Sequence, residues 1–151
     1  MNREMLFRGK NLKDNEWTEG YYCQYSHTGK EKDYIIPDYA SALYGVEVDS
    51  NTIGQFTGLT DKNGTSIFEG DIVKISRQFG KYLYGEDNYV CKYDANSASY
   101  KFYYIVPKDI ADINAYAMIG DGVTISEMER GFTIEVIGNI FDNSELLHEN
   151  S

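Results

Sequence analysis

The segment from Thr52 to Val73 restricts the fold of this chain more than any other part of the sequence. It alternates short β-prone runs with glycines and turn residues, reading TIGQFTGLT, then DKNG, then TSIFEGDIV. Asn and Gly accept the left-handed backbone conformation that short hairpin loops require, so Asp-Lys-Asn-Gly predicts a tight turn between two strands. Short strands joined by such turns predict a small β-barrel-like core.

The rest of the chain predicts further hairpins around this core, with few helices. Periodicity and turn residues indicate strands at residues 5–10, 17–23, 33–36, 89–93, 100–106 and 132–136. The segment between Asp109 and Gly120 has helical spacing of apolar residues, and residues 142–147 predict one helical turn. We therefore expect an α+β fold, predominantly β, with one short helix. We expect a single domain over 1–151. Its first candidate subdomain consists of residues 1–75 together with 132–143, and its second is a variable region, 76–131.

Charge is spread unevenly along the chain. The formal net charge is −10, of which residues 1–32 contribute +1 and residues 33–151 contribute −11. A nucleic-acid backbone would be repelled by most of such a surface. The acidic excess therefore indicates either a solvated face that keeps the protein soluble or a face that meets a basic partner.

Tyrosine is the compositional outlier, with fourteen residues in 151. Its strand propensity and polar tip favour half-buried sheet positions. In the run 100–105, aromatic or apolar residues fall on both faces of the predicted strand, which is typical of a core strand or a subunit contact. We predict a homo-oligomer, with this candidate interface: Tyr100, Phe102, Tyr103 and Tyr104.

No constellation of residues in the sequence identifies a chemical reaction. Glu69 and Asp71 are a candidate acid–base pair, but a structural interpretation is favoured, in which Gly70 permits a bend and Asp71 bonds nearby backbone amides. We expect no cofactor and no metal. Cys23 and His27 have a plausible ligand separation, but the remaining cysteine and histidine, Cys91 and His148, come from distant segments. Both cysteines are expected to be free thiols.

The longest apolar runs have five residues, whereas a membrane-spanning helix needs about 20. The opening residues also lack the apolar core of a signal peptide. We therefore expect no membrane insertion and a cytoplasmic location.

Several motifs along the chain resemble the YopX family of phage and prophage proteins. They are FRGK at 7–10, EW at 16–17, GYY at 20–22, TIGQFTGLTDKNG at 52–64, IFEGDIV at 67–73 and VIGNIFDN at 136–143. Residues 76–130 match no part of the family pattern that we can place. The central motif contains the residues that we take as a structural signature: Gly54, Gln55, Phe56, Thr57, Gly58, Asp61, Asn63, Gly64, Glu69, Gly70 and Asp71.

The resemblance implies a β-rich, barrel-containing protein encoded by a phage or prophage and acting inside a bacterial host. It implies no established activity, cofactor or catalytic residue. We therefore expect a non-enzymatic accessory protein that works by binding a host or phage protein and self-associates. Three alternatives stay open: an acidic protein that binds a basic host partner, an enzyme using Glu69 or Asp71, and a nucleic-acid-binding barrel using Arg3, Arg8, Lys10 and Lys13.

Overall fold

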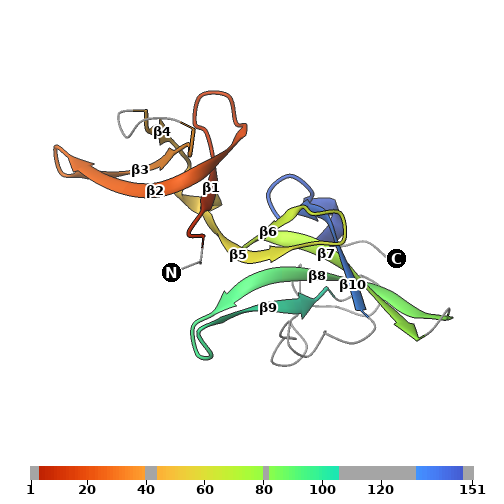
Figure 1. The fold of residues 1–151 in the computed structure, drawn as a ribbon. Coiled ribbons are helices and arrows are strands. Elements are labelled where there is room, and N and C mark those ends of the chain that lie inside the picture. Colours follow the sequence, from red (N-terminus) through yellow and green to blue (C-terminus); the bar gives the residue numbers. More distant parts are fainter. Residues whose placement is uncertain (1–3, 40–43, 80–81, 106–131, 148–151) are drawn as a thin grey trace, which may run out of the picture. The chain divides into compact units, whose positions relative to one another are not determined.

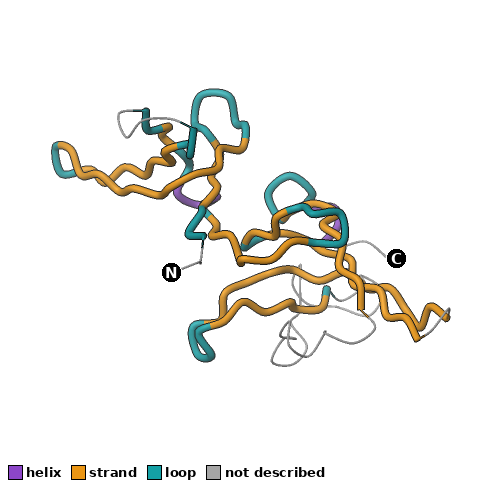
Figure 2. Tube along the Cα trace, in the orientation of Figure 1, coloured by secondary structure: helices purple, strands orange, loops and turns teal. Residues whose placement is uncertain are grey.

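The structure is a computed structural model that describes residues 4–39, 44–79, 82–105 and 132–147 (Figure 1). The chain divides into two compact units, Met1–Gly58 and Leu59–Ser151. Each unit is built of antiparallel strands, which make up most of the described chain (Figure 2). Strand β5 (Gly54–Thr60) contains the boundary between the units, after Gly58. Over the described ranges, the helical elements are two 3-10 turns, η1 (Ser50–Thr52) and η3 (Ser144–Leu147).

The first unit is one antiparallel sheet with strand order β4-β3-β2-β1-β5. Its strands besides β5 are β1 (Phe7–Lys10), β2 (Trp17–His27), β3 (Lys30–Ile36) and β4 (Val46–Glu47). The predicted first hairpin is confirmed, with partners running from Phe7 opposite Gly20 to Lys10 opposite Trp17.

The hairpin of β2 and β3 has a turn of only two residues, Thr28 and Gly29, so both strands are longer than the predicted strands at 17–23 and 33–36. Seven residue pairs join the strands, from Tyr21 opposite Ile36 to His27 opposite Lys30. Residues 21–26 of β2 are all exposed, although neighbouring residues of a strand point to opposite faces. The outer half of this hairpin is therefore open to solvent on both faces.

The second unit contains a four-stranded antiparallel sheet of order β10-β7-β8-β9. Its strands are β7 (Asp71–Phe79), β8 (Tyr82–Asp94), β9 (Ser99–Tyr104) and β10 (Phe132–Asn139). The short strand β6 (Ser66–Phe68) follows the turn after β5. The predicted strands at 89–93 and 100–106 are confirmed and pair as a hairpin, with Tyr89 opposite Tyr104 and Asp94 opposite Ser99.

Both faces of this sheet carry buried side chains, because alternate residues of its central strands belong to different apolar clusters. Val73 and Cys91 lie in one cluster with Phe102, while Ile72 and Val90 lie in the other. All five are completely inaccessible to solvent. The unit therefore has its own core, which explains the adjacent buried apolar residues Ile72-Val73 in β7 and Val90-Cys91 in β8.

The predominantly β fold is confirmed, but neither sheet closes into a barrel within the described residues, so the expected barrel-like core is not confirmed. The turn signal at 61–64 does make a hairpin between β5 and β6, but local turns do not determine whether the first and last strands of a sheet meet. The helix expected between Asp109 and Gly120 lies outside the described residues. Among those described, no helix has the length and apolarity needed to cross a membrane.

Candidate functional site

Asp61 organises the turn between β5 and β6. Its Oδ1 accepts hydrogen bonds from the backbone N–H groups of Asn63 at 2.8 Å and Thr65 at 2.9 Å. Its Oδ2 accepts a third from the N–H of Val136 in β10 at 2.9 Å. The turn itself is closed by a backbone hydrogen bond of 3.0 Å, which the N–H of Gly64 donates to the carbonyl of Asp61. One buried carboxylate therefore fixes a turn and a distant strand together.

The pKa of Asp61 is lowered from its ordinary value. Burial alone would raise this pKa, but the hydrogen bonds from Val136, Thr65 and Asn63 favour the ionised carboxylate and together outweigh the burial. Asp61 is thus held as an anion by backbone groups, which suits an acceptor of hydrogen bonds.

The Glu69-Gly70-Asp71 segment forms the bend that starts β7. Gly70 has φ +89°, a left-handed conformation that disfavours any residue with a Cβ. Asp71 is 1% exposed, and its Oδ2 accepts a hydrogen bond from Phe68 N–H at 2.8 Å. Glu69 is half-buried. The buried Asp71 carboxylate therefore bonds the backbone across the bend in the way that the sequence pattern predicts.

The C-terminal motif forms a second compact turn, centred on Asn139. Its side-chain Oδ1 accepts hydrogen bonds from Phe141 N–H at 3.0 Å and Asp142 N–H at 2.9 Å. Asn143 Oδ1 accepts from Asn139 N–H at 3.2 Å. A Cβ at Gly138 would lie 2.5 Å from that same Oδ1, so the turn requires glycine there. This accounts for the Gly-Asn and Asp-Asn pairs of the motif.

Hydrogen bonds join the central and C-terminal motifs directly. Besides the Asp61–Val136 bond, Lys62 N–H donates to the Ile134 carbonyl at 3.0 Å and Ile140 N–H donates to the Gly70 carbonyl at 2.9 Å. We call this set of contacts the signature junction: Asp61, Lys62, Gly70, Ile134, Val136 and Ile140. Two motifs far apart in sequence thus form one structural unit built on backbone contacts.

The family described as YopX protein matches residues 6–148, which include both motifs of the signature junction. The chain belongs to the YopX family. A crystal structure of protein EF1440 from Enterococcus faecalis is similar over 97% of this chain and 100% of that chain, with 23% sequence identity and a TM-score of 0.48. A search of curated proteins gave no match.

The remaining signature residues of this YopX-family chain lie on β5. Phe56 is buried, and its N–H donates to the Leu6 carbonyl at 2.8 Å. Gln55 stands opposite Phe7 of β1, and Gly54 stands opposite Arg8. Thr57 and the exposed Gly58 complete the run within the same strand. These residues therefore connect β5 to β1.

The candidate interface of β9 lies against the core of the second unit. Phe102 is completely buried, and Tyr100 and Tyr104 pack beside it. Tyr103 packs on the other face, against the cluster that contains Ile105. The two apolar faces of this strand thus have partners within their own unit. The subunit contact at these residues stays a prediction.

Two of the basic residues considered for nucleic-acid binding are buried. Arg8 and Lys10 are 8% and 9% exposed and lie over the ring of Trp17, at 4.5 and 5.3 Å from its centroid. Lys13 is exposed, and Arg3 lies outside the described residues. Cation–π packing rather than an open basic patch is therefore the visible role of Arg8 and Lys10.

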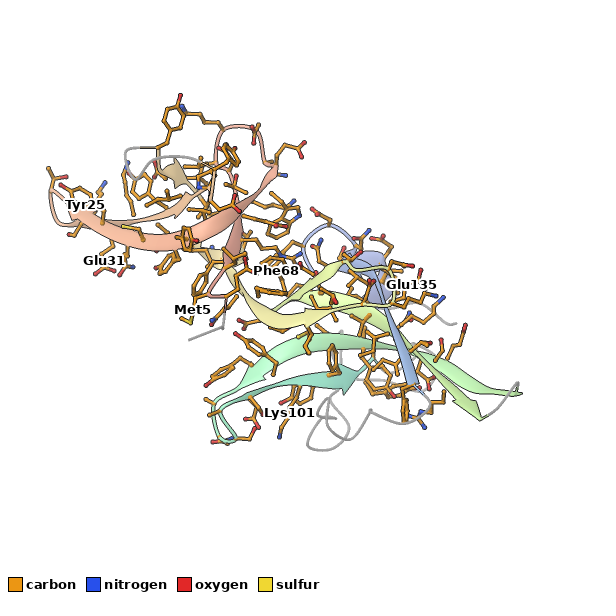
Figure 3. The ribbon with its side chains drawn as sticks, in the orientation of Figure 1. Met5, Tyr25, Glu31, Phe68, Lys101 and Glu135 are labelled. Carbon is orange, nitrogen blue, oxygen red and sulfur yellow. The ribbon has the colours of Figure 1, made fainter. Side chains whose placement is uncertain are left out.

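The exposed tyrosines of the first unit were not predicted from the sequence as a candidate site. Tyr21 and Tyr25 of β2 are 53% and 56% exposed, and Figure 3 shows Tyr25 and Glu31 toward the outer end of the hairpin. Tyr39 and Tyr44 are exposed as well. The signal for the β2 tyrosines is present in the sequence: residues 21–26, YYCQYS, contain no charged side chain.

Beside β4 is a hollow of about 370 Å³, lined by Asn11, Leu12, Lys13, Tyr34, Tyr44, Gly45, Val46 and Glu47. Glu47 there forms an exposed ion pair with Lys32 at 3.4 Å. Over the part of the chain that the structure describes, no three His, Cys, Asp or Glu side chains converge to hold a metal ion. Cys23 is an exposed free thiol and Cys91 a buried one.

Proposed function

We propose that this protein is a phage- or prophage-encoded accessory protein that acts in the host cytoplasm by binding and not by catalysis, and that it self-associates. The observation that carries the proposal is the contrast between the signature carboxylates and the exposed tyrosines. The signature carboxylates Asp61 and Asp71 are buried and bonded to backbone groups. Among the described residues, six of the nine exposed large hydrophobic side chains are instead tyrosines, and five of these six lie in the first unit.

Exposed tyrosines suit a binding surface for a physical reason. Each offers a large apolar ring that loses little side-chain entropy on contact, together with a hydroxyl that can form a hydrogen bond. Tyr21, Tyr22 and Tyr25 follow one another along a hairpin that is open to solvent on both faces. A two-stranded hairpin is only marginally stable alone, so covering it would stabilise it.

Sedimentation velocity over a range of protein concentrations tests self-association. We expect the weight-average sedimentation coefficient to rise with concentration and to approach that of a defined oligomer. A strict monomer at high micromolar concentration would remove self-association from the proposal.

A second candidate, a basic host partner, is favoured by the charge distribution. Residues 33–151 carry a net charge of −11, so attraction to a basic surface would weaken as salt screens it. Immobilised protein should then retain basic proteins from a host lysate and release them on salt elution. Retention that is insensitive to salt would contradict this candidate. The burial of Arg8 and Lys10 weighs against nucleic acid as the partner.

A further inference from the structure

The outer half of β2 has a free edge. On one side, Tyr21–His27 pairs with β3. On the other side, β1 pairs only with residues 17–20, because its first residue, Phe7, stands opposite Gly20. Within the described ranges, no strand therefore pairs with the second edge of residues 21–27.

The register shows which backbone groups this edge presents. Gln24 stands directly opposite Asp33, and the Asp33 carbonyl accepts a hydrogen bond from Val48 N–H on the far side of β3. Opposite residues in an antiparallel pair either bond each other or both point away. Gln24 therefore directs its N–H and C=O to the free edge, and so do Tyr22 and Ser26, which lie two positions away on either side.

The free edge also lacks the usual protection against pairing. Proteins commonly guard exposed edges with charged side chains or proline. Residues 21–26 have neither. The charges on the facing strand cancel, since Lys30 and Lys32 balance Glu31 and Asp33. A surface that is locally neutral on a chain of net charge −10 is where a second copy meets the least repulsion.

We propose that two copies of this chain pair antiparallel through their β2 edges, about a two-fold axis at Gln24. This inference rests on the self-association proposed above and specifies which residues of the two copies meet. An isologous antiparallel contact maps the free segment 21–27 onto itself only when Gln24 faces its own copy. Tyr22 then stands opposite Ser26 of the second copy, and Cys23 stands opposite its Tyr25.

This register makes the most hydrogen bonds. Three outward-pointing positions meet in hydrogen-bonded pairs, giving about six backbone bonds. A contact centred on Cys23 would be limited to residues 21–25 by β1 at Gly20, giving about four. A neutral residue on the axis also avoids the like-charge repulsion that an isologous contact imposes on a charged one.

The first test removes one backbone N–H donor that points to the free edge of β2. Gln24→Pro deletes an N–H that points to the free edge and leaves every β2–β3 backbone bond in place. Gln24→Ala is the matched control, because it loses the same side-chain contacts to Glu31 and Asp33 at 3.4 Å but keeps the N–H. We expect at least a tenfold weaker dimer for Gln24→Pro than for Gln24→Ala by sedimentation. Ser26→Pro against Ser26→Ala repeats the test should Gln24→Pro unfold.

The second test determines the register between the two β2 strands by disulfide cross-linking. Gln24→Cys in a Cys23→Ser background places two thiols on the axis, where the Cα atoms of a hydrogen-bonded pair lie about 5.5 Å apart, within disulfide range. An added copper–phenanthroline oxidant takes two electrons, two protons leave, and the S–S bond forms. We expect covalent dimer from this variant. The unaltered protein, with Cys23 two residues out of register, should form much less.

The outcomes separate the two proposals. If the unaltered protein is monomeric, both self-association and the β2 contact are overturned. If it is oligomeric and both proline variants associate as tightly as their alanine controls, the β2 contact is overturned and self-association stands. Faster cross-linking through Cys23 than through Gln24→Cys would overturn the register centred on Gln24.

Discussion

The backbone N–H of Val136 donates a hydrogen bond to the carboxylate of Asp61 over 2.9 Å, although 75 positions separate the two residues in the sequence. The same carboxylate bonds Asn63 and Thr65 in its own turn. The turn therefore cannot be altered without affecting the contact with β10. This coupling explains why a family signature can consist of turn residues.

Asp61→Ala should lower the free energy of unfolding by about 3 kcal/mol, because three backbone donors lose a charged acceptor. Urea denaturation followed by circular dichroism measures this change. The control is Lys62→Ala, which removes only the neighbouring ion pair to Glu135 at 3.0 Å, whose partners are 47% and 38% exposed. An exposed pair contributes less than about 1 kcal/mol. Equal losses for both variants would contradict the role given to Asp61.

Stability should fall in acid through the same residue. The pKa of Asp61 is lower in the folded protein than its ordinary value of 3.8, so its contribution is fully present above pH 3.8 and is lost as pH falls through the folded pKa. Asp61→Asn has no such titration. The difference in unfolding free energy between the unaltered protein and Asp61→Asn should therefore shrink below pH 4. A difference independent of pH would contradict this prediction.

Tyr22 should titrate abnormally. Its hydroxyl donates to Asp33 Oδ1 at 2.6 Å, and this bond, with burial and the nearby negative charge, raises its pKa to about 12. The folded pKa exceeds the ordinary 10.0, so the contribution to stability is present below pH 10 and is lost as pH rises toward 12.

NMR of ring-labelled tyrosine measures the titration of Tyr22, with Tyr22→Phe assigning its signal. In Asp33→Asn the pKa should move back toward 10. An unchanged value in that variant would show that Asp33 is not the cause.

Gly138→Ala should destabilise the protein by about 1–3 kcal/mol, because the added methyl would displace the Asn143 side chain. The double variant Gly138→Ala/Asn143→Ala removes the two nearest atoms that the methyl meets, Asn143 Oδ1 at 2.5 Å and Cγ at 2.7 Å, and leaves only the Asn143 Cβ at 3.0 Å. Its loss should be clearly smaller than the sum of the two single losses, which a double-mutant cycle by denaturation measures. Additive losses would mean that the clash lies elsewhere.

Hairpins were predictable from the sequence because their signals are local. The Asp-Lys-Asn-Gly turn, the 89–104 hairpin and the alternating strand at 132–136 follow from residues that are near neighbours along the chain. The position of the β2–β3 hairpin was predicted correctly, but its strands are longer than predicted. The local sequence does not show how far a strand continues beyond its contacts with the core. The bond by which Asp71 caps the Phe68 N–H across the bend also spans only three residues.

By itself, the sequence determined the antiparallel, strand-rich character of this protein, its turns and its membership of the YopX family, because turn chemistry and alternation act over a few residues. Only the tertiary structure decided that Asp61 reaches Val136 and that β2 extends past β1. It also decided that, among the described strands, the sheets do not close and no strand pairs with the outer edge of β2. Those outcomes depend on which distant strands pair and where each pairing stops. Backbone hydrogen-bonding groups are nearly the same at every residue, so the local sequence does not identify the strand that will pair with them.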